Sequence, residues 1–211
     1  MRRGQNATRA AWIKASADYY LALHPDEAAW RRTGVDEGIP SVEEIRDRAA
    51  VADRAGKAVR RLGEEARIDP DPERHDAWSA QVGWGEETWR AVFTEGFFAA
   101  AAALKAGDSN GLEYGVRFLE ADPWCHRSGY WKARLIPKIT QLDLDESVRQ
   151  RLARVVLAVI DDPRRRREIA EYGKLARAVE TAELRGLLER RVSADDPQVC
   201  FNARQVLEKL G

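Results

Sequence analysis

Cysteine is scarce in this sequence, and long apolar runs are missing from it. The 211 residues include two cysteines, Cys125 and Cys200, whose separation of 75 positions fits neither a metal-binding motif nor a disulfide framework. The most apolar run, residues 91–104, is 14 residues long and contains polar residues, so it is too short to span a bilayer. The basic N-terminus has no apolar core behind it, which argues against a secretory signal. We therefore expect a soluble, cytoplasmic protein that does not bind membranes.

An excess of charge of either sign is absent too. Lysine plus arginine and aspartate plus glutamate both number 35, so the net charge is 0 and a charged binding site must be local. Arginine outnumbers lysine by 28 to 7. This bias suits bidentate recognition of phosphate and carboxylate groups, but the codon usage of a GC-rich genome explains it more simply.

Motifs of common catalytic chemistry are also missing. The sequence has no Gly-rich phosphate loop, no nucleophile elbow and no zinc-binding pattern. Cys125, His126 and Ser128 lie close together in sequence, but such neighbours seldom point at each other as a nucleophile and its base must. Ser128 is better explained as the N-cap of a helix. We expect no cofactor and no metal ion, and the sequence favours a protein that is not an enzyme.

Helical periodicity runs through almost the whole chain, and no stretch alternates long enough to predict a strand. Residues 1–62 are expected to form N-terminal helices, over 8–23, after Pro25 and from Ser41 onward. Residues 63–85 contain three glycines and two Asp-Pro pairs, which predict an ordered, extended connection pinned by its tryptophans. Residues 86–211 are expected to form a helical body that continues the same domain and begins with an apolar helix over 86–106.

Asp-Pro recurs three times in the C-terminal half, each time between two helical patterns, at residues 122–123, 162–163 and 196–197. The pattern predicts three helical hairpins, over residues 108–144, 145–180 and 181–211. Their first helices are expected to begin near Asp108, Asp145 and Thr181. Each second helix is expected to begin at its Asp-Pro or just after it, because Asp caps a helix start and Pro fits the first turn.

A period of 36 to 37 residues with two helices per unit is typical of an α-solenoid. The last unit, residues 181–211, resembles a HEAT-like repeat, with Leu184, Leu187 and Leu188 in the first helix and Val199, Ala203 and Val206 in the second. The resemblance is architectural, since such repeats serve many functions. It implies an all-α fold in which helical hairpins stack as a short HEAT-like α-solenoid behind an N-terminal helical extension.

In such solenoids the second helices commonly line a concave binding face. Arg164 to Arg167 are expected in the first turn of one of them, paired locally as Arg164 with Glu168 and Arg167 with Glu171, or else holding an anion. Replacing Arg165 and Arg166 by Glu is expected to spare folding. The predicted face carries these binding residues: His126, Arg127, Lys132, Arg134, Arg164, Arg165, Arg166, Arg167, Lys174, Arg177, Asn202 and Arg204.

This basic stripe predicts a non-enzymatic binding or scaffold module that holds an acidic protein segment or another subunit. The alternative is a DNA- or RNA-binding protein that uses the same Arg-rich face, with exposed tryptophans as stacking platforms. HEAT-like folds include DNA-base excision enzymes, but none of their catalytic residues can be matched to a position in this chain.

Overall fold

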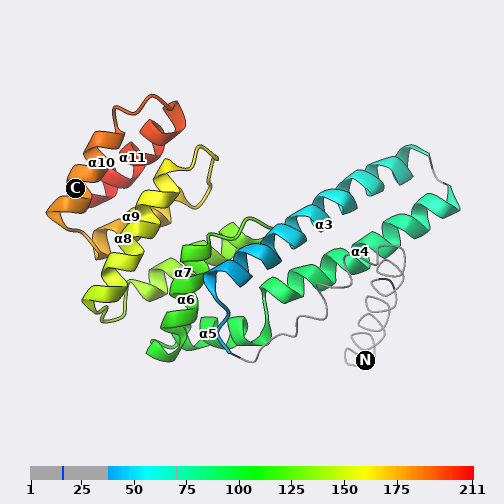
Figure 1. Cartoon of the computed structure of the whole chain (residues 1–211), viewed down its shortest axis with the longest axis horizontal. Helices are drawn as coiled ribbons and strands as arrows, with labels where there is room; N and C mark the ends of the chain where they lie inside the picture. The colour runs from blue at the N-terminus through cyan, green and yellow to red at the C-terminus, as the bar shows by residue number, and fades with distance from the viewer. Residues whose placement is uncertain (1–15, 17–37, 70) are drawn as a thin grey trace. The chain divides into compact units, whose positions relative to one another are not determined.

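The computed structural model describes residues 16, 38–69 and 71–211 (Figure 1). Within these residues every regular element is a helix and no strand occurs, which confirms the predicted all-α class. The helices expected over residues 8–23 and after Pro25 lie outside the described residues. The described chain divides into two compact units. The N-terminal unit contains Glu43–Thr94 and Trp124–His126, and the C-terminal unit contains Ile39–Val42, Glu95–Pro123 and Arg127–Gly211.

The N-terminal unit is built on two long helices, α3 (Val42–Ile68) and α4 (Pro72–Val92), which lie side by side (Figure 1). The buried face of α3 consists of one isoleucine and three alanines, Ile45, Ala49, Ala52 and Ala55. Such small side chains let a neighbouring helix come close. Gln81 of α4 donates a hydrogen bond from Nε2 to the carbonyl of Ala55 at 3.4 Å, so the two helices are also joined by a buried polar contact.

The expectation of an extended connection over residues 63–85 is wrong. Helix α3 continues to Ile68, and α4 already begins at Pro72, where the Asp71 carboxylate accepts a hydrogen bond from the Glu73 amide. Gly63 lies inside α3, where a Cβ atom would come within 2.9 Å of Nε1 of Trp78. Gly63 makes room for a tryptophan of the neighbouring helix, and the second Asp-Pro pair starts a helix. The glycine and the Asp-Pro pairs therefore do not mark a loop here.

The single helix predicted over residues 86–106 is divided in the structure. Helix α4 ends at Val92, where Phe93 leaves helical geometry with φ −106° and ψ 72°, and α5 covers Glu95–Lys105. The buried side chains of α5, Phe97 and Leu104, belong to the C-terminal unit. The ring of Phe97 lies 4.8 Å from that of Phe118 between centroids, so α5 packs on the first hairpin.

The three predicted hairpins are present in the C-terminal unit. They are α6 (Leu112–Ala121) with α7 (Ser128–Ile139), α8 (Glu146–Asp161) with α9 (Ile169–Ala178), and α10 (Ala182–Arg191) with α11 (Pro197–Leu210). The expected starts of the first helices are confirmed. Asp108 caps the 3-10 turn Ser109–Gly111 that leads into α6, Asp145 caps α8 and Thr181 caps α10.

The hairpins pack in order along the chain. Helices α6, α8 and α10 pack on one another in turn, and so do α7, α9 and α11. Arg151 of α8 bridges two carboxylates of α6, at 2.7 Å from Glu113 and 2.7 Å from Glu120. Among the fully buried side chains, Ile136, Leu152 and Leu188 come from three different hairpins, so the core is continuous through the C-terminal unit. No helix in the described part of the chain is both long and apolar enough to cross a membrane.

Candidate functional site

The Asp-Pro turns differ from one another in a way that the sequence did not reveal. The predicted helix start is confirmed at Asp196, whose Oδ1 accepts hydrogen bonds from the amides of Gln198 and Val199 at 2.7 and 3.3 Å. Neither of the other two Asp-Pro pairs starts a helix. Helix α7 begins at Ser128, where the sequence placed a helix start, although the cap position belongs to Arg127, and α9 begins only at Ile169. Asp122 instead ends α6 in the left-handed conformation, with φ 45°, and Asp162 ends α8. Their carboxylates therefore bind side chains rather than a helix start.

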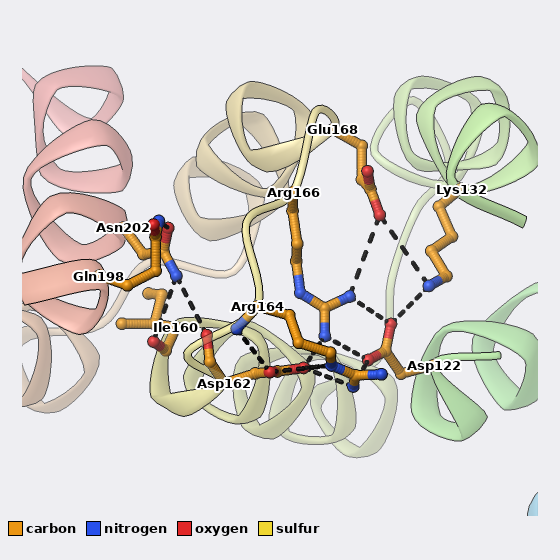
Figure 2. A network of polar contacts seen from close by, with 9 residues as sticks. All are labelled: Asp122, Lys132, Ile160, Asp162, Arg164, Arg166, Glu168, Gln198 and Asn202. Atoms are coloured by element: carbon orange, nitrogen blue, oxygen red, sulfur yellow. Dashed lines mark hydrogen bonds and ion pairs between the residues drawn. The ribbon is translucent and has the colours of Figure 1, made fainter. Parts of the chain in front are cut away.

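Asp122 is the centre of an ion network that joins the first hairpin to the second (Figure 2). It accepts a hydrogen bond from Nζ of Lys132 at 2.6 Å and two from the Arg166 guanidinium, at 2.8 and 2.6 Å. Arg166 also donates to Asp162, which accepts a further hydrogen bond from Nε of Arg164 at 2.7 Å. Two aspartates at the ends of α6 and α8 thus share one arginine.

The network is buried and electrically balanced. The side chains of Lys132 and Arg166 are 0% exposed, and that of Glu168 is 8% exposed, 4.0 Å from Lys132 and 3.9 Å from Arg166. With Arg164, these groups supply three positive charges against three negative ones on Asp122, Asp162 and Glu168. Buried charges are costly unless they are paired and hydrogen-bonded, so removing one member should leave an uncompensated charge in the interior.

Burial and ion pairing shift the pKa values of the network in opposite directions. Burial raises the pKa of Asp162, but hydrogen bonds from Arg164 and the charge of Arg166 outweigh it and lower that pKa to about 2. Burial lowers the pKa of Lys132, and the neighbouring Asp122 counteracts part of this shift. Burial also raises the pKa of Tyr172 well above its ordinary value. Its side chain therefore stays neutral beside the network at physiological pH.

The second and third hairpins are joined by uncharged hydrogen bonds at the position where ion pairs join the first and second. Asn202 of α11 donates from Nδ2 to the backbone carbonyls of Ile160 and Asp162, at 3.5 and 3.3 Å (Figure 2). Gln198 holds the Asn202 side chain through a hydrogen bond of 2.8 Å. Arg166 binds the turn of the first hairpin, and Asn202 binds the turn of the second. The first two Asp-Pro turns are therefore each bound by a residue of the hairpin that follows.

Three of the twelve predicted binding residues are consequently interior. Lys132, Arg166 and Asn202 are buried and join hairpins, so they do not present side chains on an exposed face. Arg164 is 47% exposed and pairs with Asp162. The other eight predicted residues are exposed, namely His126, Arg127, Arg134, Arg165, Arg167, Lys174, Arg177 and Arg204.

The local pairing expected for the arginine run is wrong. Arg164 to Arg167 precede α9 instead of forming its first turn, because the helix begins at Ile169. Arg164 pairs with Asp162 rather than Glu168, and Glu171 pairs with Lys174 at 2.9 Å rather than with Arg167. The segment before α9 is irregular, with a bend at Arg164, and it buries Arg166 while Arg165 and Arg167 stay exposed.

Lys174 and Arg177 meet a third cation in a shallow groove of about 470 Å³, lined by Thr140, Lys174, Arg177, Ala178 and Lys209. The groove lies at the ends of α7, α9 and α11, where Arg177 and Lys209 occupy the last helical turns. Within the described residues neither of these two side chains forms an ion pair. Thr140 and Lys209 were not among the predicted binding residues. A cation in the last turn of successive second helices could have indicated Lys209 from the sequence.

A glycine brings the two walls of this groove together. A Cβ atom on Gly173 of α9 would lie 2.6 Å from Cγ and 2.9 Å from Cβ of Lys209. The stem of Lys209 therefore packs directly on the backbone of α9 at Gly173. The geometry suits an anionic group, because cations from two helices converge on one opening.

Exposed aromatic residues gather elsewhere in the C-terminal unit, on α5 and α7. Tyr130 is 53% exposed and Phe98 40% exposed, and the Arg134 guanidinium lies 5.1 Å from the ring centre of Tyr130. The tryptophans, expected as exposed stacking residues, differ in the structure: Trp84 is 1% exposed, whereas Trp124 is exposed at 39%.

No arrangement typical of a metal centre occurs in the described ranges, where no three His, Cys, Asp or Glu side chains are grouped to hold an ion. Neither Cys125 nor Cys200 forms a disulfide in the part of the chain that the structure describes. Comparison of the chain with protein-family models, with curated proteins and with solved structures finds no match.

Proposed function

We propose that this chain is a non-enzymatic binding module whose C-terminal hairpins hold an acidic protein segment. The observation that carries the proposal is the groove in which Lys174, which also pairs with Glu171, converges with Arg177 and Lys209. None of the described residues that line it is a carboxylate. Guanidinium and ammonium groups bind carboxylates through charge-assisted hydrogen bonds, which are stronger than neutral ones. The main cluster of buried ionisable groups joins two hairpins, a structural role that supports a binding function over a catalytic one.

The packing of successive hairpins supports a short HEAT-like stack as the frame of this site. First helices contact first helices and second helices contact second helices, as in solenoids of paired helices. In this proposal the groove lies on the row of second helices, the row that commonly forms the binding face. A cytoplasmic location, inferred from two cysteines that form no disulfide within the described residues, belongs to the same proposal.

The proposal is tested by charge reversal in the groove. The double variant Lys174→Glu/Arg177→Glu is titrated against a fluorescent peptide rich in Asp and Glu, beside the wild-type protein. Each lost charge-assisted contact corresponds to about 1.5 to 3 kcal/mol, so affinity should fall at least tenfold. Both residues are exposed, and melting curves should stay close to that of the wild type.

The matched control is Arg154→Glu/Arg190→Glu, which changes the net charge by the same amount on the first helices α8 and α10. Both arginines are exposed and form no ion pair within the described residues. The control should bind the peptide almost as the wild type does. Equal losses in both variants would mean that the peptide senses only net charge, and unchanged binding by the groove variant would rule the groove out.

A further inference from the structure

The exposed face of α7 combines positive charge with aromatic rings. Tyr130, Arg134 and Lys138 follow one another at four-residue intervals, which places them on one face of the helix. Residues 123–142 contain no aspartate or glutamate. The face is therefore positive along the length of the helix, although the whole chain has a net charge of 0.

The aromatic platform consists of Phe98, Tyr130, Trp131 and Arg134. The ring of Trp131 meets Phe98 of α5 edge to face at 5.6 Å and Tyr130 at 5.7 Å between centroids. The Arg134 guanidinium lies 5.1 Å from the centre of Tyr130 and 5.5 Å from that of Trp131, and it also donates a hydrogen bond to the Tyr130 hydroxyl. Four flat groups from two helices thus hold one another in place.

The aromatic platform packs on a buried side chain of the core. Trp131 contacts Phe97 edge to face at 5.2 Å, and Phe97 is 1% exposed. Tyr130 and Phe98 lie on the solvent side of this contact. A ligand that binds here therefore finds the rings already ordered, which removes part of the entropy cost of binding.

Flat aromatic and guanidinium groups beside unopposed cations match the chemistry of an unpaired nucleotide. A base stacks on an aromatic ring or on an arginine plane, while its phosphate pairs with nearby cations. An acidic peptide has carboxylates for the cations but no flat group for the rings. The bases of a duplex are stacked on each other and are not available for this contact.

We propose that the aromatic platform is a contact site for single-stranded nucleic acid. At least one base stacks on Tyr130, and phosphates lie beside Arg134 and Lys138. The site shares no residue with the groove at Lys174 and Arg177, so it does not depend on the function proposed above. The sequence raised nucleic-acid binding over the whole Arg-rich face, and this proposal places it on one face of α7. The exposed stacking residue is Tyr130 and not a tryptophan.

The test is a titration of the full chain against fluorescent oligo-dT and oligo-U of about 15 nucleotides, a length in the range that small single-strand-binding domains cover. Binding is expected at low salt and should weaken as salt is raised, because phosphate contacts release counterions. The change Tyr130→Ala should reduce affinity about fivefold or more, as the loss of one stacked base does. Arg134→Gln should reduce it as well, and Tyr130→Phe, which keeps the ring, should bind as the wild type does.

Phe201→Ala and Arg154→Gln serve as matched controls. Phe201 is 50% exposed on α11, close to the exposure of Tyr130, and Arg154 is an exposed arginine of α8. Both controls should keep wild-type affinity, and all variants should keep the wild-type melting temperature. If Tyr130→Ala melts early, Arg134→Gln decides the test, because its affinity must fall while Arg154→Gln keeps that of the wild type.

Several results would overturn the proposal. These are no binding of either oligonucleotide at low salt, binding that Tyr130→Ala leaves unchanged, and equal losses in the Phe201→Ala control. Tighter binding of a duplex of the same length would also exclude stacking as the basis of recognition. An Asp- and Glu-rich peptide that depends on Tyr130 as strongly as the oligonucleotides do would assign the platform to a protein partner instead.

Discussion

The guanidinium of Arg166 donates one hydrogen bond to each carboxylate oxygen of Asp122, a residue 44 positions earlier in the chain. Such two-pronged pairs fix orientation as well as distance. The contact lies at the turn between α6 and α7 and joins the first hairpin to the second. Arg166 comes from the run Arg164 to Arg167, all four of which were predicted on an exposed binding face.

Arg166→Met is expected to destabilise the protein by about 3 to 5 kcal/mol, because it leaves the three carboxylates of Asp122, Asp162 and Glu168 against only two cations. The neighbouring Arg165→Met should change stability by no more than about 0.5 kcal/mol, because Arg165 is exposed. Denaturant unfolding of both variants measures the difference. The burial of Arg166 reverses the expectation that the double change of Arg165 and Arg166 to Glu spares folding. Equal effects of the two single changes would contradict the network described here.

The stability of the protein should fall in acid because of Asp162. Its pKa in the folded state is about 2, below the ordinary value of 3.8, so the folded state binds fewer protons than the unfolded state between these values. The stabilisation is present above about pH 4 and is lost as the pH falls toward 2. Unfolding free energies across this window should decline less steeply for Asp162→Asn than for the wild type. Asp143→Asn, which removes an exposed carboxylate, serves as the control, and identical slopes in all three proteins would refute the assignment.

Gly173→Ala should destabilise the protein by about 1 to 3 kcal/mol, because the new methyl group would overlap the stem of Lys209 where α11 packs on α9. Gly186→Ala is the matched control in α10, where the nearest atom to the added Cβ is Nη1 of Arg190 at 3.9 Å. It should raise stability by about 0.5 to 1 kcal/mol, since alanine favours a helix interior more than glycine does. Thermal melts of both variants give the comparison, and a stabilising Gly173→Ala would show that the helices are less closely packed.

A fragment of residues 1–107 should expose apolar surface. Phe97 and Leu104 of α5 are 1% exposed and pack in the C-terminal unit, so cutting the chain after Gly107 removes their partners. The fragment should bind an apolar dye and aggregate more readily than a fragment of residues 1–94, which lacks α5. Light scattering and dye fluorescence compare the two. If the longer fragment melts cooperatively without binding dye, α5 belongs to the N-terminal part instead.

Local sequence signals were enough to establish the helical class and the starts of three helices. Asp145 and Thr181 cap α8 and α10 through their own side chains, so a capping residue followed by a periodic apolar pattern is sufficient evidence. The hairpin pattern follows in the same way from Asp-Pro pairs between such helices. These features depend on neighbours within four positions, which a sequence displays directly.

Only the tertiary structure decided which charged residues face solvent. Lys132 and Arg166 are wholly buried, while Arg165 and Arg167 beside Arg166 are exposed, and nothing in the run of four arginines distinguishes them. The difference arises because Asp122, which is distant in sequence, lies where its carboxylate pairs with the side chain of Arg166. Gly63 is a second example. It does not end α3 but leaves room for Trp78 of α4 to pack against the backbone of α3. Long-range pairing and close approach depend on distances between elements, and a sequence by itself contains no such distances.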